Sequence, residues 1–400
     1  MNIHEYQAKK ILSRYGVNIP KGGVAYTPEE AKRVASKVSA RGPWMLKAQV
    51  QSGARKKGYF LEKEAGKRGG IRLVKLKKEI TKQAEQMLGS TLVTVQTGPK
   101  GKPVSRLYVE AYNKVERIFY AGIAVDRESA TLTLLVAPIK QEEITSLIIN
   151  SPHKILRLPL SLNGRTSPSQ IKEILSFLKL PPQSAKSLKS LIRGMHKVFI
   201  EYDATMVEIN PVGLLPSGDI IALDAKISFD DNALYRHPDI RKLQDDYETS
   251  ERELKAMRSK FSYSEFDGSI GCIVNGDGIA LAAMDMLRKK GIGTACFLNV
   301  KGGVDKDKIA SGIKIILTNP RVEGVLINIL GGFLRCNLIA EGIILAASEV
   351  GLNVPLVVRF EGTNKDEAKD ILQKSKFPIT LAETMEDAIN LLVQAVEESD

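Results

Sequence analysis

Cysteine, aromatic residues and long apolar runs are all scarce in this chain of 400 residues. The three cysteines, Cys272, Cys296 and Cys336, show no CxxC spacing, which argues against a disulfide framework or a cysteine-based zinc site and favours a reducing compartment. No apolar run approaches the roughly 18 residues of a membrane helix. Residues 1–6 contain an early acid and lack the apolar stretch of a signal peptide, so we expect a cytoplasmic protein.

The net charge of +12 is concentrated at one end of the sequence. Residues 1–100 hold 21 Lys and Arg against 7 Asp and Glu, a balance of +14, which leaves about −2 for the rest of the chain. A basic first quarter fits either a nucleic acid or a polyphosphate ligand. The aromatic content of 6% offers no cluster of stacking platforms for bases, so we favour the polyphosphate.

From residue 269 onward, short apolar segments rich in branched residues alternate with amphipathic stretches. This repeat of strand and helix predicts an α/β domain with a doubly wound parallel sheet. Because 400 residues exceed one ordinary domain, we expect a separate domain before it. The predicted strands are 269–274, 294–299, 324–329, 355–359 and 378–381, and the predicted helices are 278–290, 305–318, 336–350, 364–374 and 384–397.

Two glycine-bearing turns follow strands of this sheet, at the edge where open parallel sheets bind their ligands. They are Asn-Gly-Asp-Gly at 275–278 and Gly-Gly-Phe-Leu at 331–334. Glycine lets the backbone approach a ligand, and the amides at the start of the next helix favour an anion such as phosphate. The alternative is that these glycines only permit tight connections. Cys336 is interpreted as a packing residue rather than a reactive thiol.

The first part of the chain mixes helices and strands. Thr27 and Glu30 form a capping box around Pro28, which predicts a helix to about Ser39. Residues 51–70 are rich in Gly and Lys without periodicity, so we expect a functional loop. The densely charged stretch 241–260 is predicted to be one linker helix at a domain boundary. The other predicted helices are 4–15, 81–88, 168–179 and 184–201, and the predicted strands are 44–50, 91–97, 105–112, 118–126, 131–138, 206–214 and 219–226.

Two charged residues lie in apolar strands of this part. Lys47 lies inside the strand 44–50, where an ammonium group is costly unless it meets an anion such as a nucleotide phosphate. The alternative is a lysine at a strand edge that extends to solvent. Glu110 ends the strand 107–110 and could accept a hydrogen bond from an adenine or ribose edge, or simply be exposed.

The predicted hairpin gathers polar side chains on one face. If residues 216–218 form its loop, Asn210 lies opposite Asp224 and Glu208 lies opposite Lys226. An amide and a carboxylate oxygen suit Mg²⁺, which completes its shell with water and phosphates, so Asn210 and Asp224 are predicted ligands. Glu208 is then free to assist proton transfer or to orient a phosphorylated group. The alternative is a solvated polar face.

Taken in order, several motifs resemble those of succinate–CoA ligase β subunits, over essentially the whole chain. The most specific motifs are Glu-Ile-Asn-Pro at 208–211 with Asp224, Asn-Ala-Leu-Tyr-Arg at 232–236, and Asn-Ile-Leu-Gly-Gly-Phe-Leu-Arg-Cys at 328–336. Asn-Ile-His-Glu-Tyr-Gln-Ala-Lys at 2–9, Leu-Lys-Ala-Gln-Val at 46–50 and Gly-Cys-Ile-Val-Asn-Gly at 271–276 fit the same family. The resemblance implies an ATP-grasp domain of two subdomains over residues 1–241 and a flavodoxin-like CoA-ligase domain over residues 242–400.

The resemblance also implies a reaction and a partner. In the family, succinate, CoA and ATP or GTP give succinyl-CoA, nucleoside diphosphate and phosphate, through a phosphohistidine on an α subunit that also binds most of the CoA. By this resemblance Asn210 and Asp224 hold Mg²⁺, and Glu208 contacts the phosphohistidine. The nucleotide is held by Lys47, Ala54, Arg55, Lys56, Glu110 and Asn113, and the succinate pocket shared with α includes Asn275, Gly332, Phe333 and Leu334.

Four departures from the family pattern leave alternatives open. The phosphate-covering loop reads Gly-Ala-Arg-Lys-Lys at 53–57 in place of Gly-Gly-Arg-Gly-Lys, Ile118 replaces a glutamate, Ile-Lys-Gln at 139–141 replaces Glu-Gly-Gly, and Asn337 replaces an aspartate. The choices between ATP and GTP, succinate and malate or another dicarboxylate, and αβ and α2β2 assembly stay open. A non-catalytic paralogue that binds α or a polyphosphate is a further alternative, and a nucleic-acid binder is the third.

Overall fold

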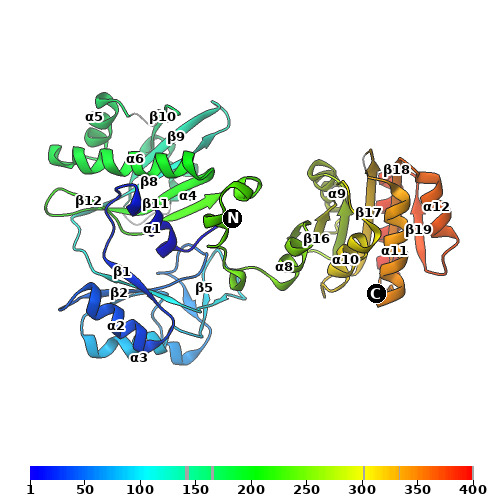
Figure 1. The fold of residues 1–400 in the computed structure, drawn as a ribbon, viewed down its shortest axis with the longest axis horizontal. Helices are drawn as coiled ribbons and strands as arrows, with labels where there is room; N and C mark the ends of the chain where they lie inside the picture. Colours follow the sequence, from blue (N-terminus) through cyan, green and yellow to red (C-terminus); the bar gives the residue numbers. More distant parts are fainter. Residues whose placement is uncertain (140–143, 164–165, 301, 333, 399–400) are drawn as a thin grey trace. The chain divides into compact units, whose positions relative to one another are not determined.

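The chain divides into two compact units, Met1–Glu248 and Thr249–Asp400. The structure is a computed structural model that describes residues 1–139, 144–163, 166–300, 302–332 and 334–398 (Figure 1). The division after residue 248 lies close to the boundary predicted after residue 241. Among the described residues, none of the helices combines the length and apolar character that crossing a membrane would need.

The first unit begins with a small α/β layer. Its four-stranded sheet runs in the order β1 (Gly22–Ala25), β7 (Leu107–Ala111), β2 (Trp44–Ala48), β4 (Ile71–Val74). The helices α2 (Pro28–Val38) and α3 (Ile80–Glu85) lie side by side, and α2 packs on β1 and β7 over a core that contains Trp44 and Leu46. A three-stranded sheet of β3 (Tyr59–Phe60), β5 (Thr91–Val93) and β6 (Lys102–Pro103) completes this part.

The other part of the first unit is a larger sheet covered by helices (Figure 1). Its strands run in the order β10 (Leu156–Leu160), β9 (Thr131–Pro138), β8 (Arg117–Asp126), β11 (Ala204–Leu214), β12 (Ile220–Ala222), and β13 (Lys226–Phe229) also pairs with β11. The helices α1 (Glu5–Arg14), α5 (Pro168–Phe177) and α6 (Ala185–Glu201) bury one face of the sheet in a single apolar core. The helix α4 (Ile144–Asn150) contributes to a small cluster around Tyr120 and Leu147.

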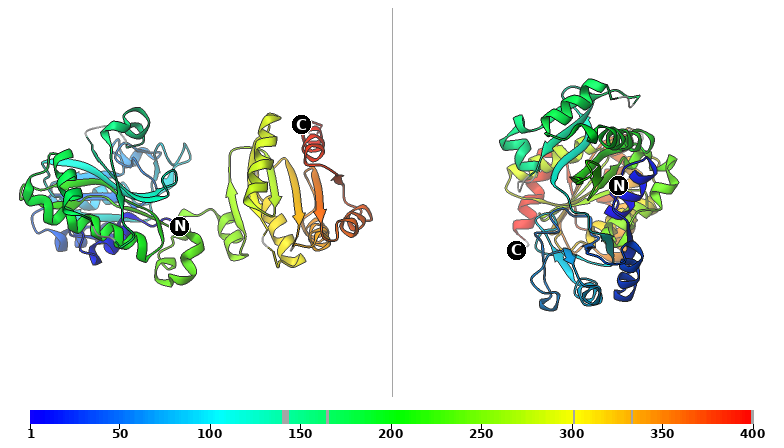
Figure 2. Two further views of the ribbon diagram at one scale, coloured as in Figure 1. Left: turned by 90° about the horizontal axis from the view of Figure 1, so that it is seen from above. Right: turned by 90° about the vertical axis from the view of Figure 1, so that its left-hand side faces the viewer.

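The second unit is a doubly wound sheet, as predicted. The strand order is β14 (Ser262–Glu265), β16 (Thr294–Asn299), β15 (Ile270–Val274), β17 (Gly324–Gly331), β18 (Leu356–Gly362), β19 (Ile379–Ala382), with only β14 antiparallel among these strands. Without β14 this is the flavodoxin-like order 2-1-3-4-5. The helices α9 (Asp277–Lys289) and α13 (Met385–Glu397) cover one face, and α10 (Lys306–Leu317), α11 (Cys336–Val350) and α12 (Lys365–Gln373) cover the other (Figure 2).

The prediction of a single helix over residues 241–260 is wrong. The helix α7 (Pro238–Arg241) ends where that helix should begin, and α8 (Glu251–Arg258) covers only the second half of the range. Ser250 starts α8 with a capping box in which its hydroxyl and the Glu253 carboxylate accept each other's backbone N–H. Upstream, Asp245 and Glu248 use their carboxylates to bind other parts of the first unit, so the segment 242–250 has tertiary rather than helical partners.

The three cysteines are buried in the second unit and act as packing residues, as expected for Cys336. Burial raises the pKa of Cys272 to about 12 and also raises the pKa values of Cys296 and Cys336. Since the thiolate is the reactive species, native thiols should react slowly with a disulfide reagent.

We expect fewer than one thiol per chain to be labelled by Ellman's reagent within minutes in native buffer, and all three in guanidinium chloride. The measurement is absorbance at the released thiolate band, with free cysteine as the control for reagent activity. Rapid native labelling of one or more thiols would contradict the buried positions of Cys272, Cys296 and Cys336.

Candidate functional site

The polar hairpin has the predicted register. Glu208 pairs with Lys226 and Val212 pairs with Ala222 across the antiparallel ladder. Between these pairs the same register brings Asn210 level with Asp224, although neither residue belongs to a regular ladder pair there. The expectation that the amide and the carboxylate oppose each other across the hairpin is therefore consistent with the strand pairing.

Burial shows that these side chains share one face. Val207 and Ile209 are fully buried in the core, whereas Glu208 and Asn210, which alternate with them, are only partly buried. On the opposing segment, Ala225 and Ile227 are buried and the flanking Asp224 and Lys226 are not. The Asn210 amide donates to Glu208 at 3.3 Å, and burial raises the pKa of Glu208.

The Asp224 carboxylate lies beside a cation. Its Oδ2 accepts from Arg55 Nη2 at 2.7 Å, its Oδ1 accepts from the Ala225 N–H at 2.8 Å, and its side chain is 25% exposed. Burial and the nearby Glu5 carboxylate raise the pKa of Asp224, against the opposing effect of Arg55. The carboxylate thus binds a positive charge here, and with the Asn210 amide it offers the oxygen chemistry that Mg²⁺ accepts.

Lys47 and Glu110 are buried and paired. Lys47 lies in β2, an interior strand, and its ammonium group donates to Glu5 Oε1 at 2.7 Å and contacts Glu110. The alternative of an edge lysine that extends to solvent is therefore wrong, and so is an exposed Glu110. Burial would lower the pKa of Lys47, but Glu5 and Glu110 raise it, so the ammonium is charged. The anion that meets it is a protein carboxylate.

Two further charged residues, Lys9 and Glu5, belong to the same buried group as Lys47 and Glu110 and were not predicted. Lys9 is fully buried and donates to Glu110 Oε2 at 2.6 Å, and Glu5 accepts from Lys9 at 2.9 Å and from Arg55 Nη2 at 2.7 Å. Both residues lie on α1, on the buried face that also contains Ala8 and Leu12. Charged residues at i and i+4 beside apolar ones at i+3 and i+7 are the signal that could have identified them.

The six side chains form one charge-balanced network, which we call the ion cluster. Both ammonium groups also donate to the Leu223 carbonyl at 2.6 Å, next to Asp224. Buried ions are stable only when paired, and removing one partner of a buried pair typically costs about 3–5 kcal/mol. The members are Glu5, Lys9, Lys47, Arg55, Glu110 and Asp224.

The remaining predicted nucleotide residues lie outside the ion cluster. Ala54 has a positive φ of 56° and its carbonyl accepts from the N–H groups of Lys57 and Gly58, which makes a tight turn in the loop. Lys56 is exposed, and the Asn113 amide donates to the Ala111 carbonyl at 2.9 Å. Two departures from the family pattern also belong to this unit. Ile118, in β8, pairs with Gly213 of β11, and Lys140 and Gln141 lie outside the described residues.

The two glycine turns of the second unit meet at the point where the strand order reverses. Asn275 follows β15, and its amide donates to the Leu330 carbonyl at 2.6 Å and accepts the Leu330 N–H at 2.8 Å. Leu334 is buried, Gly332 has open space around the position of a Cβ, and Phe333 lies outside the described residues. The turns are thus side by side, at the edge where parallel sheets bind ligands.

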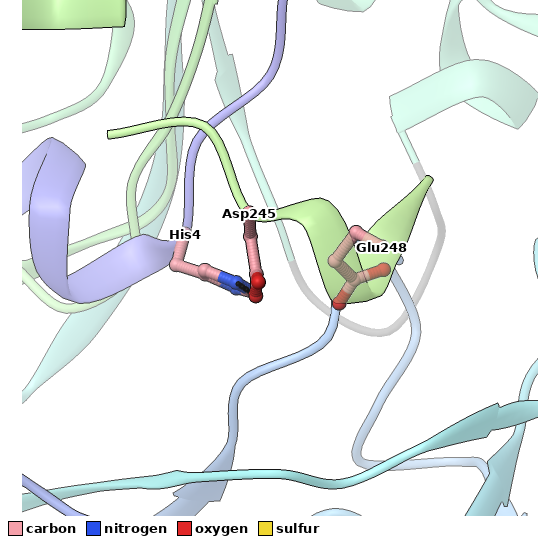
Figure 3. Close-up of side chains that lie close together, drawn as sticks. All are labelled: His4, Asp245 and Glu248. Carbon is pink, nitrogen blue, oxygen red and sulfur yellow. Dashed lines mark hydrogen bonds and ion pairs between the residues drawn. The ribbon is translucent and has the colours of Figure 1, made fainter. Parts of the chain in front are cut away.

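A second buried polar cluster joins the first helix to the segment before the second unit (Figure 3). His4 Nε2 lies 2.7 Å from Asp245 Oδ2, and the ligand atoms of His4, Asp245 and Glu248 lie within 4.8 Å of one another. Arg106 contacts Asp245 at 2.7 Å and Lys102 contacts Glu248 at 2.6 Å. Because both carboxylates have cationic partners, we interpret this cluster as an anchor for residues 245–248 rather than a metal site.

Comparisons with known proteins agree with these two units. Residues 2–214 match the family described as ATP-grasp domain, and residues 273–393 match the family described as CoA-ligase. The ADP-forming succinate–CoA ligase subunit beta of Acidiphilium cryptum is 45% identical and that of Rhodospirillum rubrum 44% identical, each over 400 residues and the whole of both chains. An ATP citrate lyase of Methanothrix soehngenii, solved with citrate and coenzyme A, aligns with a TM-score of 0.70 over 98% of this chain and 99% of that chain; at 16% identity this supports the fold alone.

We expect the free energy of unfolding of the first unit to fall between pH 7.5 and 5.5, partly because of His4. Burial lowers the pKa of His4, against the opposing effect of Asp245, with Glu248 and Arg106 also nearby. The unfolded state then binds a proton near the ordinary His value of about 6.5 while the folded state does not, so stability is lost as the pH falls. His4→Gln should reduce this loss by on the order of 1 kcal/mol.

The measurement is urea unfolding followed by the fluorescence of Trp44, the single tryptophan, which is buried in the first unit. His153→Gln, at an exposed position, is the matched control. His196, whose pKa is also lowered by burial, should account for part of the slope that is left. An unchanged pH slope in His4→Gln would contradict the assignment.

Proposed function

We propose, from the premise that this chain belongs to the succinate–CoA ligase β-subunit family, that its first unit binds ATP and transfers the terminal phosphoryl group to a histidine of a partner subunit. The overall reaction converts ATP, succinate and CoA into ADP, phosphate and succinyl-CoA, and it is reversible. The names of the relatives specify the ADP-forming reaction, which favours ATP over GTP. The partner is an α subunit, in an αβ or α2β2 assembly in the cytoplasm.

The observation that carries this proposal is the position of the Arg55 guanidinium beside the Asp224 carboxylate. Arg55 contacts this carboxylate directly, and Lys47 belongs to the same salt-bridge network through Glu5, so the proposed phosphate-binding and metal-binding groups are adjacent. In the proposed site, Lys47, Arg55 and Lys56 attract the phosphates, while Ala54 shapes the loop over them. Mg²⁺, held by Asn210 and Asp224, would supply charge neutralisation of the phosphoryl oxygens.

Three other residues complete the proposed nucleotide site. Glu110 orients Lys47 through their buried contact. Asn113 follows β7, the strand that contains Glu110, and is proposed to contact the nucleotide. Glu208 lies on the same face as Asn210 and accepts from its amide, so it is close enough to the proposed metal ligands to orient the imidazole that receives the phosphoryl group. A carboxylate with a raised pKa suits contact with an imidazole that changes charge during transfer.

The second unit is proposed to bind the acid substrate together with the α subunit. Asn275, Gly332, Phe333 and Leu334 are the proposed contributions of this chain. The Asn275 amide fixes the ends of β15 and β17 relative to each other, which leaves the turn at Gly332 free to present its backbone to an anion. CoA is proposed to bind mainly to α. A dicarboxylate other than succinate, such as malate, is the competing substrate.

The chain purified with its cognate α subunit should form succinyl-CoA from succinate, CoA and ATP in the presence of Mg²⁺. Asp224→Ala should lower kcat/KM by about 100-fold or more, because it removes both a proposed metal ligand and the partner of Arg55. The measurement is thioester absorbance. Asp219→Ala, an exposed acid on the same hairpin, is the matched control.

Full activity in Asp224→Ala would refute the metal assignment. Faster turnover with malate than with succinate would identify malate, and not succinate, as the acid substrate. If the wild-type complex makes no product and calorimetry detects no binding of Mg²⁺–ATP to the chain, the non-catalytic paralogue is correct.

A further inference from the structure

The carboxylate of Glu5 lies at the centre of the ion cluster although its helix supplies none of the proposed nucleotide or metal ligands. Its Oε1 accepts from Lys47 at 2.7 Å and from Lys9 at 2.9 Å, and its Oε2 accepts from Arg55 at 2.7 Å. The side chain is 2% exposed, so water screens these contacts little. Glu5 therefore contacts three of the cations of the first unit at once.

One nitrogen of Arg55 is shared between two acids. Nη2 lies 2.7 Å from Glu5 Oε2 and 2.7 Å from Asp224 Oδ2. The other terminal nitrogen, Nη1, donates to the Ala48 carbonyl at 2.8 Å and fixes the plane of the guanidinium. Nη2 carries two N–H groups, so Glu5 and Asp224 each accept one of them and hold the guanidinium jointly. A divalent cation that binds Asp224 Oδ2 competes with Arg55 for that oxygen.

We propose that Glu5 is a positioning residue that determines how readily Asp224 exchanges Arg55 for a divalent cation. The inference rests on the proposed function, since it concerns the proposed magnesium ligand. With its charge present, Glu5 offers the guanidinium a second carboxylate and keeps the ion cluster balanced at three acids and three bases. Without that charge, Arg55 has Asp224 as its remaining carboxylate in the cluster.

The proposal gives opposite signs for two measurable affinities. Removing the Glu5 charge leaves an excess positive charge beside Lys47 and Arg55, so ATP without metal should bind as well as or better than to the wild type. The same change strengthens the hold of Arg55 on Asp224, so the gain in ATP affinity that Mg²⁺ confers should shrink. A merely structural role for Glu5 would weaken ATP binding equally with and without the metal.

The test is isothermal titration calorimetry of the full chain with ATP in EDTA and with ATP in excess Mg²⁺. The ratio of the two dissociation constants is the metal coupling. Glu5→Gln should lower this coupling by roughly 10–100-fold, the usual effect of losing a group that orients a metal ligand. Asp245→Asn, which removes another buried carboxylate with an arginine partner, is the matched control and should leave the coupling unchanged.

A double-mutant cycle identifies Arg55 as the intermediary. In an Arg55→Gln background, Glu5→Gln should have little further effect on the metal coupling, because the competing guanidinium is absent. Glu5→Asp, which keeps the charge, should give a coupling closer to the wild type and serves if Glu5→Gln does not fold, as judged from Trp44 fluorescence. In that case the metal coupling of Glu5→Asp is compared with the metal coupling of the double variant Glu5→Asp, Arg55→Gln.

The outcomes separate this inference from the proposed function. If the wild-type chain binds no ATP under either condition, the proposed function fails. Suppose that the wild type shows metal coupling. If Glu5→Gln then shows the same coupling, or loses ATP affinity equally with and without Mg²⁺, the proposed role of Glu5 is wrong while the nucleotide site stands. The role of Glu5 is also wrong if Glu5→Gln lowers the metal coupling equally in the wild-type and the Arg55→Gln backgrounds.

Discussion

Charge neutrality inside a buried cluster is the constraint on which the first unit depends. Lys9 on α1 bonds Glu110 of the four-stranded sheet and the Leu223 carbonyl beside the hairpin of the six-stranded sheet. Arg55 bonds Glu5 and Asp224 from the loop between them. No one of these elements can move alone without leaving an ion unpaired where water is scarce, which costs several kcal/mol. The ion cluster therefore joins both sheets and the loop to the first helix.

The fold of the second unit could be predicted almost completely from the sequence. Each of its parallel strands is a short branched apolar run followed by an amphipathic helix, so local pattern and tertiary role coincide. In the first unit, short strands such as β1, β4 and β10 were missed, because their residues do not alternate strongly and their pairing depends on distant segments. The segment 242–250 was mistaken for helix since its charged residues have partners elsewhere in the chain. Asp245 and Glu248 are examples.

The site could be predicted in part. The register of the hairpin followed from the length of one loop, and pairing of Glu208 with Lys226 confirms it. The prediction that Lys47 needs an anion was also right, but the anion in the structure is carboxylate. Sequence spacing cannot identify Glu5 as that partner, because Glu5 and Lys47 lie 42 residues apart and meet only in the folded chain. The assignments of nucleotide, metal and acid-binding residues stay proposals.

The balance of charge in the ion cluster explains where attraction for a polyphosphate must arise. Residues 1–100 have an excess of +14, yet the cluster itself contains equal numbers of acids and bases. Two of its acids, Glu110 and Asp224, lie beyond residue 100, so within residues 1–100 the cluster accounts for three bases and one acid, or +2, and other side chains carry the remaining +12. These include the exposed Lys56 and Lys57 of the loop, where the charge attracts anions at long range. In the proposed site, close binding of the phosphates requires Arg55 to exchange a carboxylate of the cluster for a phosphate. If, as we propose, a divalent cation binds Asp224, it would release Arg55 toward a phosphate, and metal and nucleotide binding would then favour each other through a guanidinium that Glu5 and Asp224 hold beforehand.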